Sequence, residues 1–197
     1  MPSRPLQSAC GVPCAIALSS GFKQKAAKAI KTQERAEHRQ AKEKIKTRSQ
    51  WIKEAEQAVR DYRRLYELSI GSGCISCGQS QEHVIAAQGW KTGGAFDAGH
   101  FLGKGARPEL RMEPNNIWLQ CKGCNAGSFK FARKGSTVSE GFRVGLIERI
   151  GLEAVEALEA DHEPRNHTIE DLKAIKAHYR AKVRELKALL ATATPDQ

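Results

Sequence analysis

The segments Cys74-Ile-Ser-Cys77-Gly78 and Cys121-Lys-Gly-Cys124-Asn125 decide the fold of this 197-residue chain. Each is a CxxC turn, which brings two thiol groups to one side of a tight loop, and 43 residues separate the two turns. Two such turns complete a tetrahedral four-sulfur site for Zn²⁺. Because cysteine fills all four ligand positions, the pattern predicts a structural zinc ion with no open position for catalysis.

Two other interpretations of these cysteines are a thioredoxin-like redox pair and free thiols. A redox CxxC opens a helix after a strand and needs no second CxxC turn, so the paired occurrence disfavours it. The chain has six cysteines and no convincing secretory signal at its start, which favours metal over disulfides because cytosolic thiols stay reduced. Cys10 and Cys14 form a third, looser pair, which we interpret as a half-site or two inert thiols.

Three polar residues between and beside the CxxC turns carry the candidate chemistry. His100 ends Asp97-Ala-Gly-His100; 15 residues lie between His100 and Asn116, and 8 between Asn116 and Asn125. We expect short extended segments at residues 95–102 and 109–112. A histidine near a strand end, an asparagine in a loop and a ligand directly after the last zinc cysteine form the ordered signature of an HNH, or ββα-metal, nuclease. A lone strand histidine is more often structural, but its place between paired cysteine turns favours the nuclease interpretation.

Five segments carry a closer resemblance. They are Trp51-Ile-Lys-x-Ala-x-Gln-Ala-Val59, Cys74-Ile-Ser-Cys-Gly78, Asp97-Ala-Gly-His100, Gln120-Cys121-x-x-Cys-Asn125 and Ile169-Glu-x-x-Lys-Ala-Ile-Lys-Ala177. These motifs resemble the phage lambda NinG (Rap) recombination endonuclease family over residues 49–187. The Cys124-Asn125 junction is also similar to phage recombination endonuclease VII, which has asparagine where most HNH enzymes have histidine.

The resemblance implies a DNA structure-specific endonuclease that acts on branched recombination intermediates such as D-loops and Holliday junctions. His100 would be the general base, since the ordinary pKa of histidine near 6.5 suits that task. Asn125 and Asp97 would hold a catalytic Mg²⁺ or Mn²⁺ through oxygen ligands, and Asn116 would pin the loop that orients His100. Gly99 stands where many HNH enzymes have a ligand. In a regular strand Asp97 and His100 point to opposite faces, and Gly99 could support a bulge that turns them together.

The charge of the chain points to a polyanionic partner. It carries 32 Lys and Arg against 22 Asp and Glu, a net charge of +10, and nucleic acid is the commonest partner of such a surplus; a solvated basic surface without a partner is the alternative. Residues 22–48 hold ten cations and three glutamates in a context of good helix formers with almost no apolar stripe. We expect a solvent-exposed or partly disordered basic helix that orders on a polyanion and binds DNA through Lys23, Lys25, Lys28, Lys31, Arg35, Arg39, Lys42, Lys44, Lys46 and Arg48.

The remaining sequence is predominantly helical. Apolar residues recur at three- and four-residue steps from Trp51 to Tyr66, which predicts an amphipathic helix with a core face. Residues 139–150, with a continuation to 160, and 168 to about 190 are the other predicted helices, the last opening on a capping-box-like Thr168-Ile-Glu-Asp. Residues 140–163 carry seven acidic residues against two arginines, so we assign them to packing or to a partner rather than to DNA.

The sequence therefore predicts an α+β protein, mostly helical, with a small central zinc-stabilised ββα-metal (HNH-like) module. The expected parts are residues 1–21 with a partial cysteine pair, the basic arm 22–48, the amphipathic helix 49–71, the nuclease module 72–135 and the helical region 136–197. No apolar run approaches the roughly 18 residues of a membrane span, so we expect a cytoplasmic protein, in the bacterial host if phage-encoded. Symmetric junction cutting would require a homodimer through the C-terminal helices, and phage or host recombination proteins are further candidate partners.

Two other classes of function fit part of the pattern. A non-catalytic zinc-knuckle DNA-binding adaptor for recombination would use the basic arm for affinity and leave His100 buried. Such a binder has no need for Asp97, His100 and Asn125 to converge, which favours the enzyme. An RNA-binding knuckle protein would require exposed aromatic residues in the knuckle loops, for which Phe129 and Phe131 are available.

Overall fold

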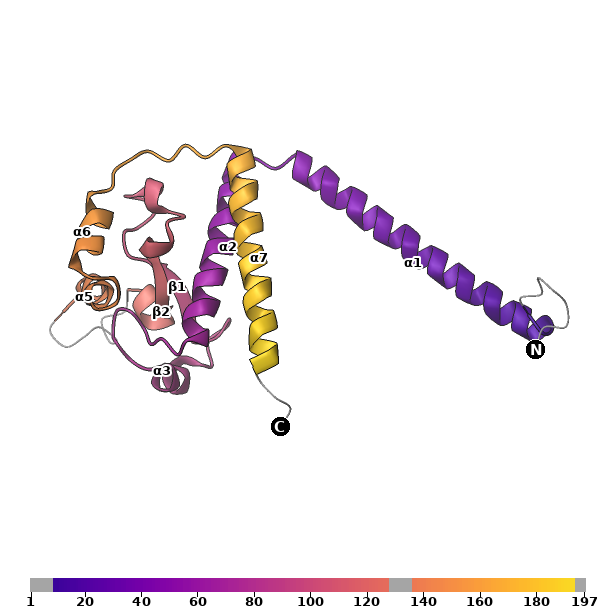
Figure 1. The fold of residues 1–197 in the computed structure, drawn as a ribbon, viewed down its shortest axis with the longest axis horizontal. Helices are drawn as coiled ribbons and strands as arrows, with labels where there is room; N and C mark the ends of the chain where they lie inside the picture. Colours follow the sequence, from indigo (N-terminus) through magenta and orange to yellow (C-terminus); the bar gives the residue numbers. More distant parts are fainter. Residues whose placement is uncertain (1–8, 128–135, 194–197) are drawn as a thin grey trace. The chain divides into compact units, whose positions relative to one another are not determined.

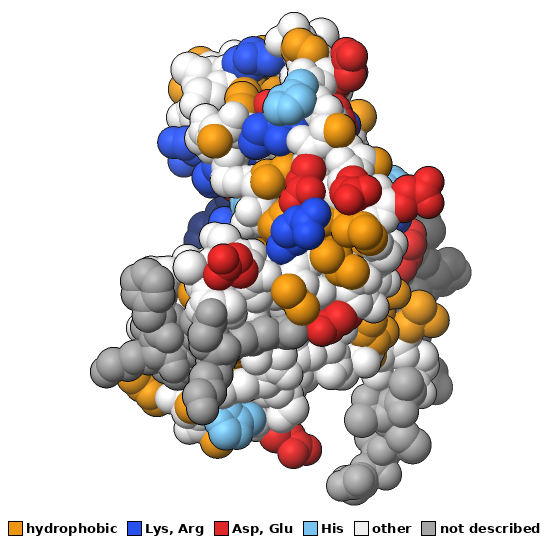
Figure 2. Space-filling view, turned by 90° about the vertical axis from the view of Figure 1, so that its left-hand side faces the viewer, with side chains coloured by type: hydrophobic (Ala, Val, Ile, Leu, Met, Phe, Trp, Pro, Cys, Tyr) orange, Lys and Arg blue, Asp and Glu red, His pale blue; other side chains and the backbone are white. Residues whose placement is uncertain are grey.

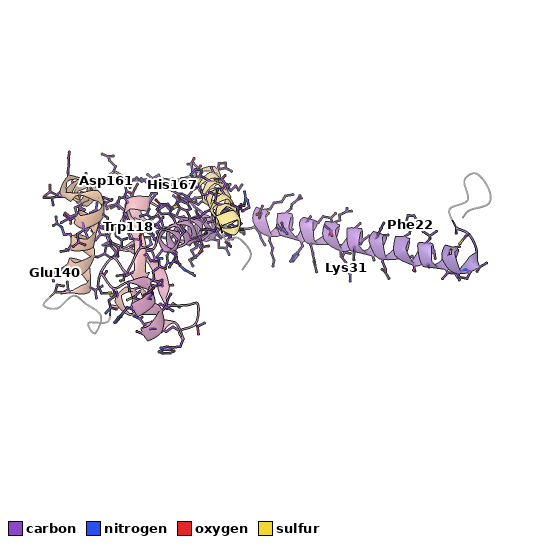
Figure 3. All side chains as sticks on the ribbon, turned by 60° about the horizontal axis from the view of Figure 1, so that its bottom comes forward. Phe22, Lys31, Trp118, Glu140, Asp161 and His167 are labelled. Carbon is purple, nitrogen blue, oxygen red and sulfur yellow. The ribbon has the colours of Figure 1, made fainter. Side chains whose placement is uncertain are left out.

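The computed structural model describes residues 9–127 and 136–193, which leaves Phe129 and Phe131 outside the described residues. The chain divides into two units, Met1–Thr47 and Arg48–Gln197. The described part of the first unit consists mainly of one helix, α1 (Val12–Lys44), which has no buried residue and carries Lys42 and Lys44 in its last turn. The basic helix expected within residues 22–48 is thus present, but it begins before that stretch and ends at Lys44. Phe22 and Lys31 project from it into solvent (Figure 3).

In the second unit, two long helices lie side by side, α2 (Arg48–Ser69) and α7 (Ile169–Ala193) (Figure 1). Trp51 and Ala55 of α2 pack with Leu172 of α7, and further along both helices Tyr62 meets Tyr179. Because the contacts advance in the same direction on both helices, α2 and α7 run parallel. The predicted capping box at the start of α7 is confirmed by two hydrogen bonds, from Asp171 N to Thr168 Oγ1 and from Thr168 N to Asp171 Oδ2.

A two-stranded antiparallel hairpin forms the centre of this unit. Strand β1 (Phe96–His100) pairs residue by residue with β2 (Ile117–Cys121), from Phe96 opposite Cys121 to His100 opposite Ile117. Sequence reasoning placed an extended segment over β1 but did not predict β2. The register is continuous through Gly99, so the strand has no bulge there, and Asp97 and His100 project from opposite faces of the strand.

Four short helical elements frame the hairpin. Residues 109–112, expected to be extended, instead contribute to a 3-10 helix, η1 (Pro108–Leu110), whose proline at the start presets a helical φ angle. A second 3-10 helix, η2 (Pro114–Asn116), leads into β2. The short helix α4 (Lys122–Asn125) follows β2 directly, and α3 (Gln81–Gln88), which the sequence reasoning missed, starts on an N-cap bond from His83 N to Ser80 Oγ.

Helices cover the hairpin on both faces (Figure 1). On one face, Ala98 and Ile117 pack against Val59 of α2. On the other, Trp118 packs with Phe142 and Leu146 of α5 (Val138–Ile150) and with α6 (Leu152–Ala160). The acidic stretch 140–163 therefore serves packing, and Figure 2 shows carboxylates and apolar side chains mixed on this side of the molecule. No helix in residues 9–127 and 136–193 is long and apolar enough to cross a membrane.

Candidate metal centre and hairpin site

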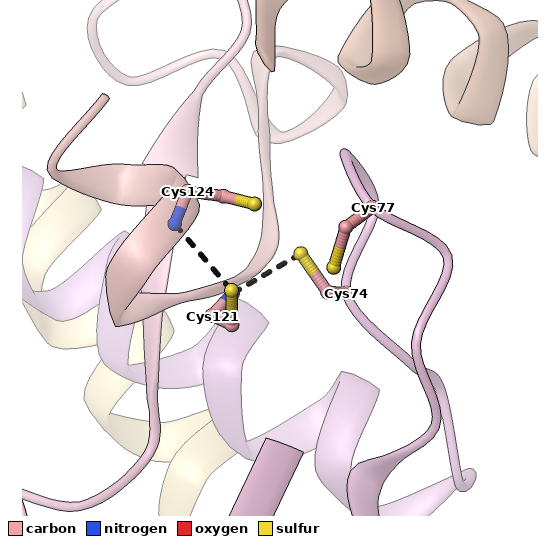
Figure 4. A group of neighbouring side chains, drawn as sticks. All are labelled: Cys74, Cys77, Cys121 and Cys124. Carbon is pink, nitrogen blue, oxygen red and sulfur yellow. Dashed lines mark hydrogen bonds between the residues drawn. The ribbon is translucent and has the colours of Figure 1, made fainter. Parts of the chain in front are cut away.

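The four cysteines of the two CxxC turns converge at one end of the hairpin (Figure 4). Their sulfur atoms all lie within 4.8 Å of one another, while an ideal tetrahedral zinc site with Zn–S bonds of about 2.3 Å places sulfurs roughly 3.8 Å apart. Cys74, Cys121 and Cys124 are buried and Cys77 is half-buried. The donor set therefore fits a closed four-sulfur metal site, and these cysteines can hold a metal ion such as Zn²⁺.

The backbone around the cysteines is shaped for this cluster. Gly78, directly after Cys77, has a φ of 72°, a conformation that L side chains rarely adopt, and its N–H donates to the Cys74 carbonyl at 2.9 Å. Backbone N–H groups also point at sulfur: Cys121 N lies 3.2 Å from Cys74 Sγ, and Cys124 N lies 3.4 Å from Cys121 Sγ. Hydrogen bonds within the cluster lower the pKa of the Cys121 thiol and raise the pKa of the Cys124 thiol, so the four sulfurs share protons closely, and a bound metal ion would take the place of these protons as thiolates form.

The structure brings Asp97 and Asn125 together beside this cluster. Asn125 ends α4, directly after the last cysteine, and its Nδ2 lies 3.5 Å from Asp97 Oδ2 on β1. Gly99 lies two residues further along β1 than Asp97 and therefore on the same face of the strand. A Cβ added at Gly99 would lie 3.1 Å from Asn125 Oδ1 and 2.1 Å from Gln120 Oε1. The absence of a side chain at Gly99 is therefore what allows Asn125 and Gln120 to approach the strand just before His100.

This close approach leads to a prediction for Gly99→Ala. The added Cβ would collide with the buried side chain of Gln120, which is held by its hydrogen bond to Ser76 Oγ at 2.8 Å. We expect the free energy of unfolding to fall by about 1–3 kcal/mol, the usual cost of overpacking. Thermal or urea unfolding checks this, and the control is Gly103→Ala, where a Cβ would meet no heavy atom within 4 Å. Equal stabilities of the two variants would contradict the prediction.

His100 lies on the opposite face, toward α2. Its Nε2 is 2.9 Å from the backbone carbonyl of Arg111; because a carbonyl only accepts hydrogen bonds, Nε2 carries the proton and Nδ1 keeps a lone pair. Burial lowers the pKa of His100, although the bond to Arg111 and the charge of Glu56 oppose the shift. The imidazole is therefore held neutral near pH 7 with one basic nitrogen available.

Asn116 is buried and bridges the chain that connects the two strands. Its Nδ2 donates to the carbonyls of Leu102 and Leu110 at 3.0 and 3.1 Å, and its Oδ1 accepts from Leu102 N at 2.8 Å. The Leu110 carbonyl directly precedes Arg111, whose carbonyl binds His100. These contacts are those expected of a residue that pins the loop, and the catalytic role of Asn116 stays a prediction.

A charged stripe on α2, which the sequence reasoning missed, faces the hairpin. Its members Glu56, Arg60, Arg63 and Glu67 are spaced by four, three and four residues, a helical spacing that could have revealed it. Arg60 Nε donates to the Ala98 carbonyl at 2.9 Å, and Lys104 Nζ lies 2.6 Å from the buried Glu56 carboxylate. His100 is thus surrounded by Arg60, Lys104 and Arg111 as well as Glu56.

The C-terminal half of the stripe forms a buried ionic cluster. The side chain of Glu67 is only 2% exposed and lies 2.7 Å from Arg149 of α5 and 3.3 Å from Arg63. The Arg63 guanidinium stacks over the Trp118 ring at 4.0 Å, and its Nε donates to the Ile117 carbonyl at 2.8 Å. Trp118, labelled in Figure 3, is thus clamped between α2 and α5.

The fold is mostly helical, with helices packed around a two-stranded hairpin. One end of the hairpin carries a four-cysteine cluster that is able to bind a metal ion. A family model described as "Bacteriophage Lambda NinG protein" matches residues 1–188. The chain therefore belongs to the NinG family.

Curated relatives agree with this assignment. The chain is 40% identical over 143 residues to "Protein ninG" of Salmonella phage P22, a match covering 73% of this chain and 61% of the relative. It is 40% identical to the Escherichia phage lambda protein of that name, with 73% and 60% covered, and 38% identical to that of Escherichia phage 933W, with 73% and 61% covered. The matched region spans about three fifths of these relatives. No solved structure matches the chain.

Proposed function

We propose that the chain is a metal-dependent HNH-type endonuclease that hydrolyses phosphodiester bonds in branched DNA, such as D-loops and Holliday junctions. The observation that carries the proposal is the state of His100: its Nε2 is fixed by the Arg111 carbonyl and its pKa is lowered by burial. A neutral, oriented imidazole is what a general base for water requires. The motif resemblance to the HNH superfamily and to recombination endonuclease VII supports the same conclusion.

In the proposed reaction, Nδ1 of His100 takes a proton from the attacking water. Arg60 and Lys104 lie close enough to act on the charge of His100, and they would stabilise the phosphate whose negative charge develops in the transition state. Asn116 would keep the Arg111 carbonyl in place and so preserve the tautomer. The zinc-filled cysteine cluster would fix the end of β2 and the start of α4.

Asp97 and Asn125 are the proposed ligands of the catalytic Mg²⁺ or Mn²⁺. Both offer oxygen atoms, and Mg²⁺ is commonly held by one or two carboxylates together with water and substrate phosphate, so the pair fits the ion. When bound, the ion would polarise the phosphate and stabilise the leaving oxygen. The pair lies on the other face of β1 from His100, so the scissile phosphate would sit at the end of the strand, beyond Gly99, within reach of both faces.

The basic helix α1 would supply affinity for DNA that does not depend on base sequence. Replacing Lys28 and Lys31 by glutamine removes two exposed cations from a helix that has no buried residue. Each lost phosphate contact is expected to reduce the slope of log affinity against log salt by about 0.7–0.9. Fluorescence titrations at several salt concentrations measure the slope. The matched control replaces the exposed Arg180 and Lys187 of α7, and equal slopes for both variants would contradict the role of α1.

A second candidate, a non-catalytic DNA-binding adaptor, is favoured by one observation: Asp97 and His100 project from opposite faces of a regular strand. In this case the cysteine cluster and α1 would suffice for function. Incubation of the wild-type protein with branched and linear DNA, with and without Mg²⁺, separates the two candidates. Cleavage that requires Mg²⁺ supports the enzyme, whereas binding without cleavage in any metal supports the adaptor.

A further inference from the structure

A cavity of about 440 Å³ lies beside the His100 site, within the second unit. It is lined by the start of α2, the segment around η1, and the connection that leads into α7. His167, labelled in Figure 3, lies on that connection just before α7. The volume falls in the range of about 300–1,000 Å³ that is typical of small-ligand sites.

The rim of the cavity is cationic. Arg48, Arg111 and Arg165 line it together with His162 and His167. Arg165 is also paired with Asp161 at 2.5 Å and Arg111 lies 3.9 Å from Glu56, so Arg48 is the arginine of the rim that has no carboxylate partner among the ion pairs of the described residues. Two of the arginines are positioned by backbone carbonyls: Arg48 Nε donates to His167 O, and Arg165 donates to Glu109 O, both at 3.0 Å. The acidic lining residue, Glu109, is already paired with Arg107 at 2.5 Å. A rim of this composition favours an anion, and arginine in particular suits phosphate.

The remaining lining is apolar. Ile52 and Met112 are half-buried and pack with the Trp51 core, and Pro108 and Pro164 complete the apolar side. Methionine is polarisable and makes favourable contacts with aromatic rings. The apolar lining therefore suits a flat aromatic group, and the basic rim suits an anion attached to it. A nucleotide, with its base and its phosphate, has both features.

The cavity and the His100 site share one residue. The carbonyl of Arg111 binds His100 Nε2 at 2.9 Å, while the residue itself lines the cavity. Resting on the cleavage function proposed above, we infer that the cavity binds an unpaired nucleotide of the DNA strand that carries the scissile phosphate. Its base leaves the stack and contacts Met112 and Ile52, and its phosphate meets the arginine rim. The substrate thus contains a single-stranded nucleotide next to the cut, as a branch point does.

The test measures binding rather than cleavage. The full-length protein is titrated, with no Mg²⁺ or Mn²⁺ added, into a single-stranded decadeoxynucleotide that contains one 2-aminopurine, whose emission rises when the base leaves the stack. His167→Glu places a carboxylate in the rim and is expected to weaken binding about tenfold by repelling the phosphate. Asn166→Glu, at an exposed lining position, is expected to act in the same direction. The matched control, His178→Glu on the exposed side of α7, should change affinity less than about twofold.

Each outcome decides the inference. Wild-type affinity in folded His167→Glu and Asn166→Glu variants, as judged by circular dichroism, would overturn it. Displacement of the strand by free dAMP at concentrations as low as those of the decanucleotide would assign the cavity to a mononucleotide and also overturn it. If wild-type protein binds the strand through the cavity but cuts no DNA in any metal, the inference stands and the proposed endonuclease activity fails. If the wild-type protein cuts branched DNA but the cavity variants bind the decanucleotide normally, the proposed endonuclease activity stands and the inference about the cavity fails.

Discussion

Replacing Cys121 with serine is expected to abolish metal binding and to unfold the hairpin. Cys121 is fully buried, ends β2, caps α4 and accepts a backbone hydrogen bond from Cys124. Structural zinc contributes apparent binding energies of about 10–16 kcal/mol in small zinc-binding peptides, and whole domains are stable by only about 5–15 kcal/mol. Loss of one ligand therefore removes a free energy comparable to the total stability.

Elemental analysis of the purified protein and thermal unfolding followed by circular dichroism measure the two effects. Cys10→Ser is the matched control, because Cys10 is exposed, lies in the first unit and is not one of the four clustered cysteines. This variant should keep one equivalent of zinc and the wild-type melting temperature. A wild-type protein that is folded and free of zinc would refute the metal centre.

His100→Ala is expected to slow cleavage of branched DNA by about 10²–10⁴-fold, the usual contribution of a positioned general base. Zinc content and DNA affinity should be unchanged, since His100 is neither a cysteine-cluster ligand nor part of α1. His83→Ala, an exposed histidine on α3, is the control and should cut at the wild-type rate. Wild-type cleavage by His100→Ala would exclude His100 as the general base and with it the proposed HNH mechanism, whereas absence of cleavage by the wild-type protein would favour the adaptor.

Two further readouts belong to the same experiment. Asn125→Ala should lose cleavage activity, and raised Mg²⁺ or Mn²⁺ should partly restore it, because the proposed role of Asn125 is to hold the ion. Near-normal cleavage by Asp97→Asn would remove Asp97 from the proposed metal site.

The pH profile of cleavage tests the role of His100 as the base. Burial lowers the pKa of His100, so the neutral, active form persists below pH 6.5. Cleavage should therefore stay on its plateau at neutral pH and decline only under more acidic conditions.

Much of this architecture follows from local sequence rules. The amphipathic spacing from Trp51 to Tyr66 predicted α2, the Thr168–Asp171 pattern predicted the start of α7, and the CxxC spacing predicted the cysteine cluster. These features were accessible because each depends on contacts within a few residues or on one strong ligand preference. The strand β2 was missed because all five of its residues are buried, which removes the alternation of apolar and polar residues that marks a strand.

The candidate site was predictable only in part, since it depends on contacts between distant segments. The spacing placed Asn125 near β1, yet it could not reveal that a side chain from α2, Glu56, lies beside His100. Nor could it show that Gly99 is needed for the approach of Gln120, because the clash arises across the hairpin. For residues 109–112, a local rule would have given the right answer. Pro108 presets a helical φ angle and starts η1, so the prediction of an extended segment was wrong.

The buried cluster of Glu67, Arg63 and Arg149 constrains how this chain can diverge. Removing Glu67 alone leaves two guanidinium groups without their counter-charge, and removing one arginine leaves the carboxylate half-compensated in a site that water hardly reaches. Single substitutions are therefore costly, whereas joint replacement by apolar residues is tolerable. Among members of the family, we expect these three positions and Trp118 to change together, so that the cluster of Glu67, Arg63 and Arg149 is either retained or lost as a whole.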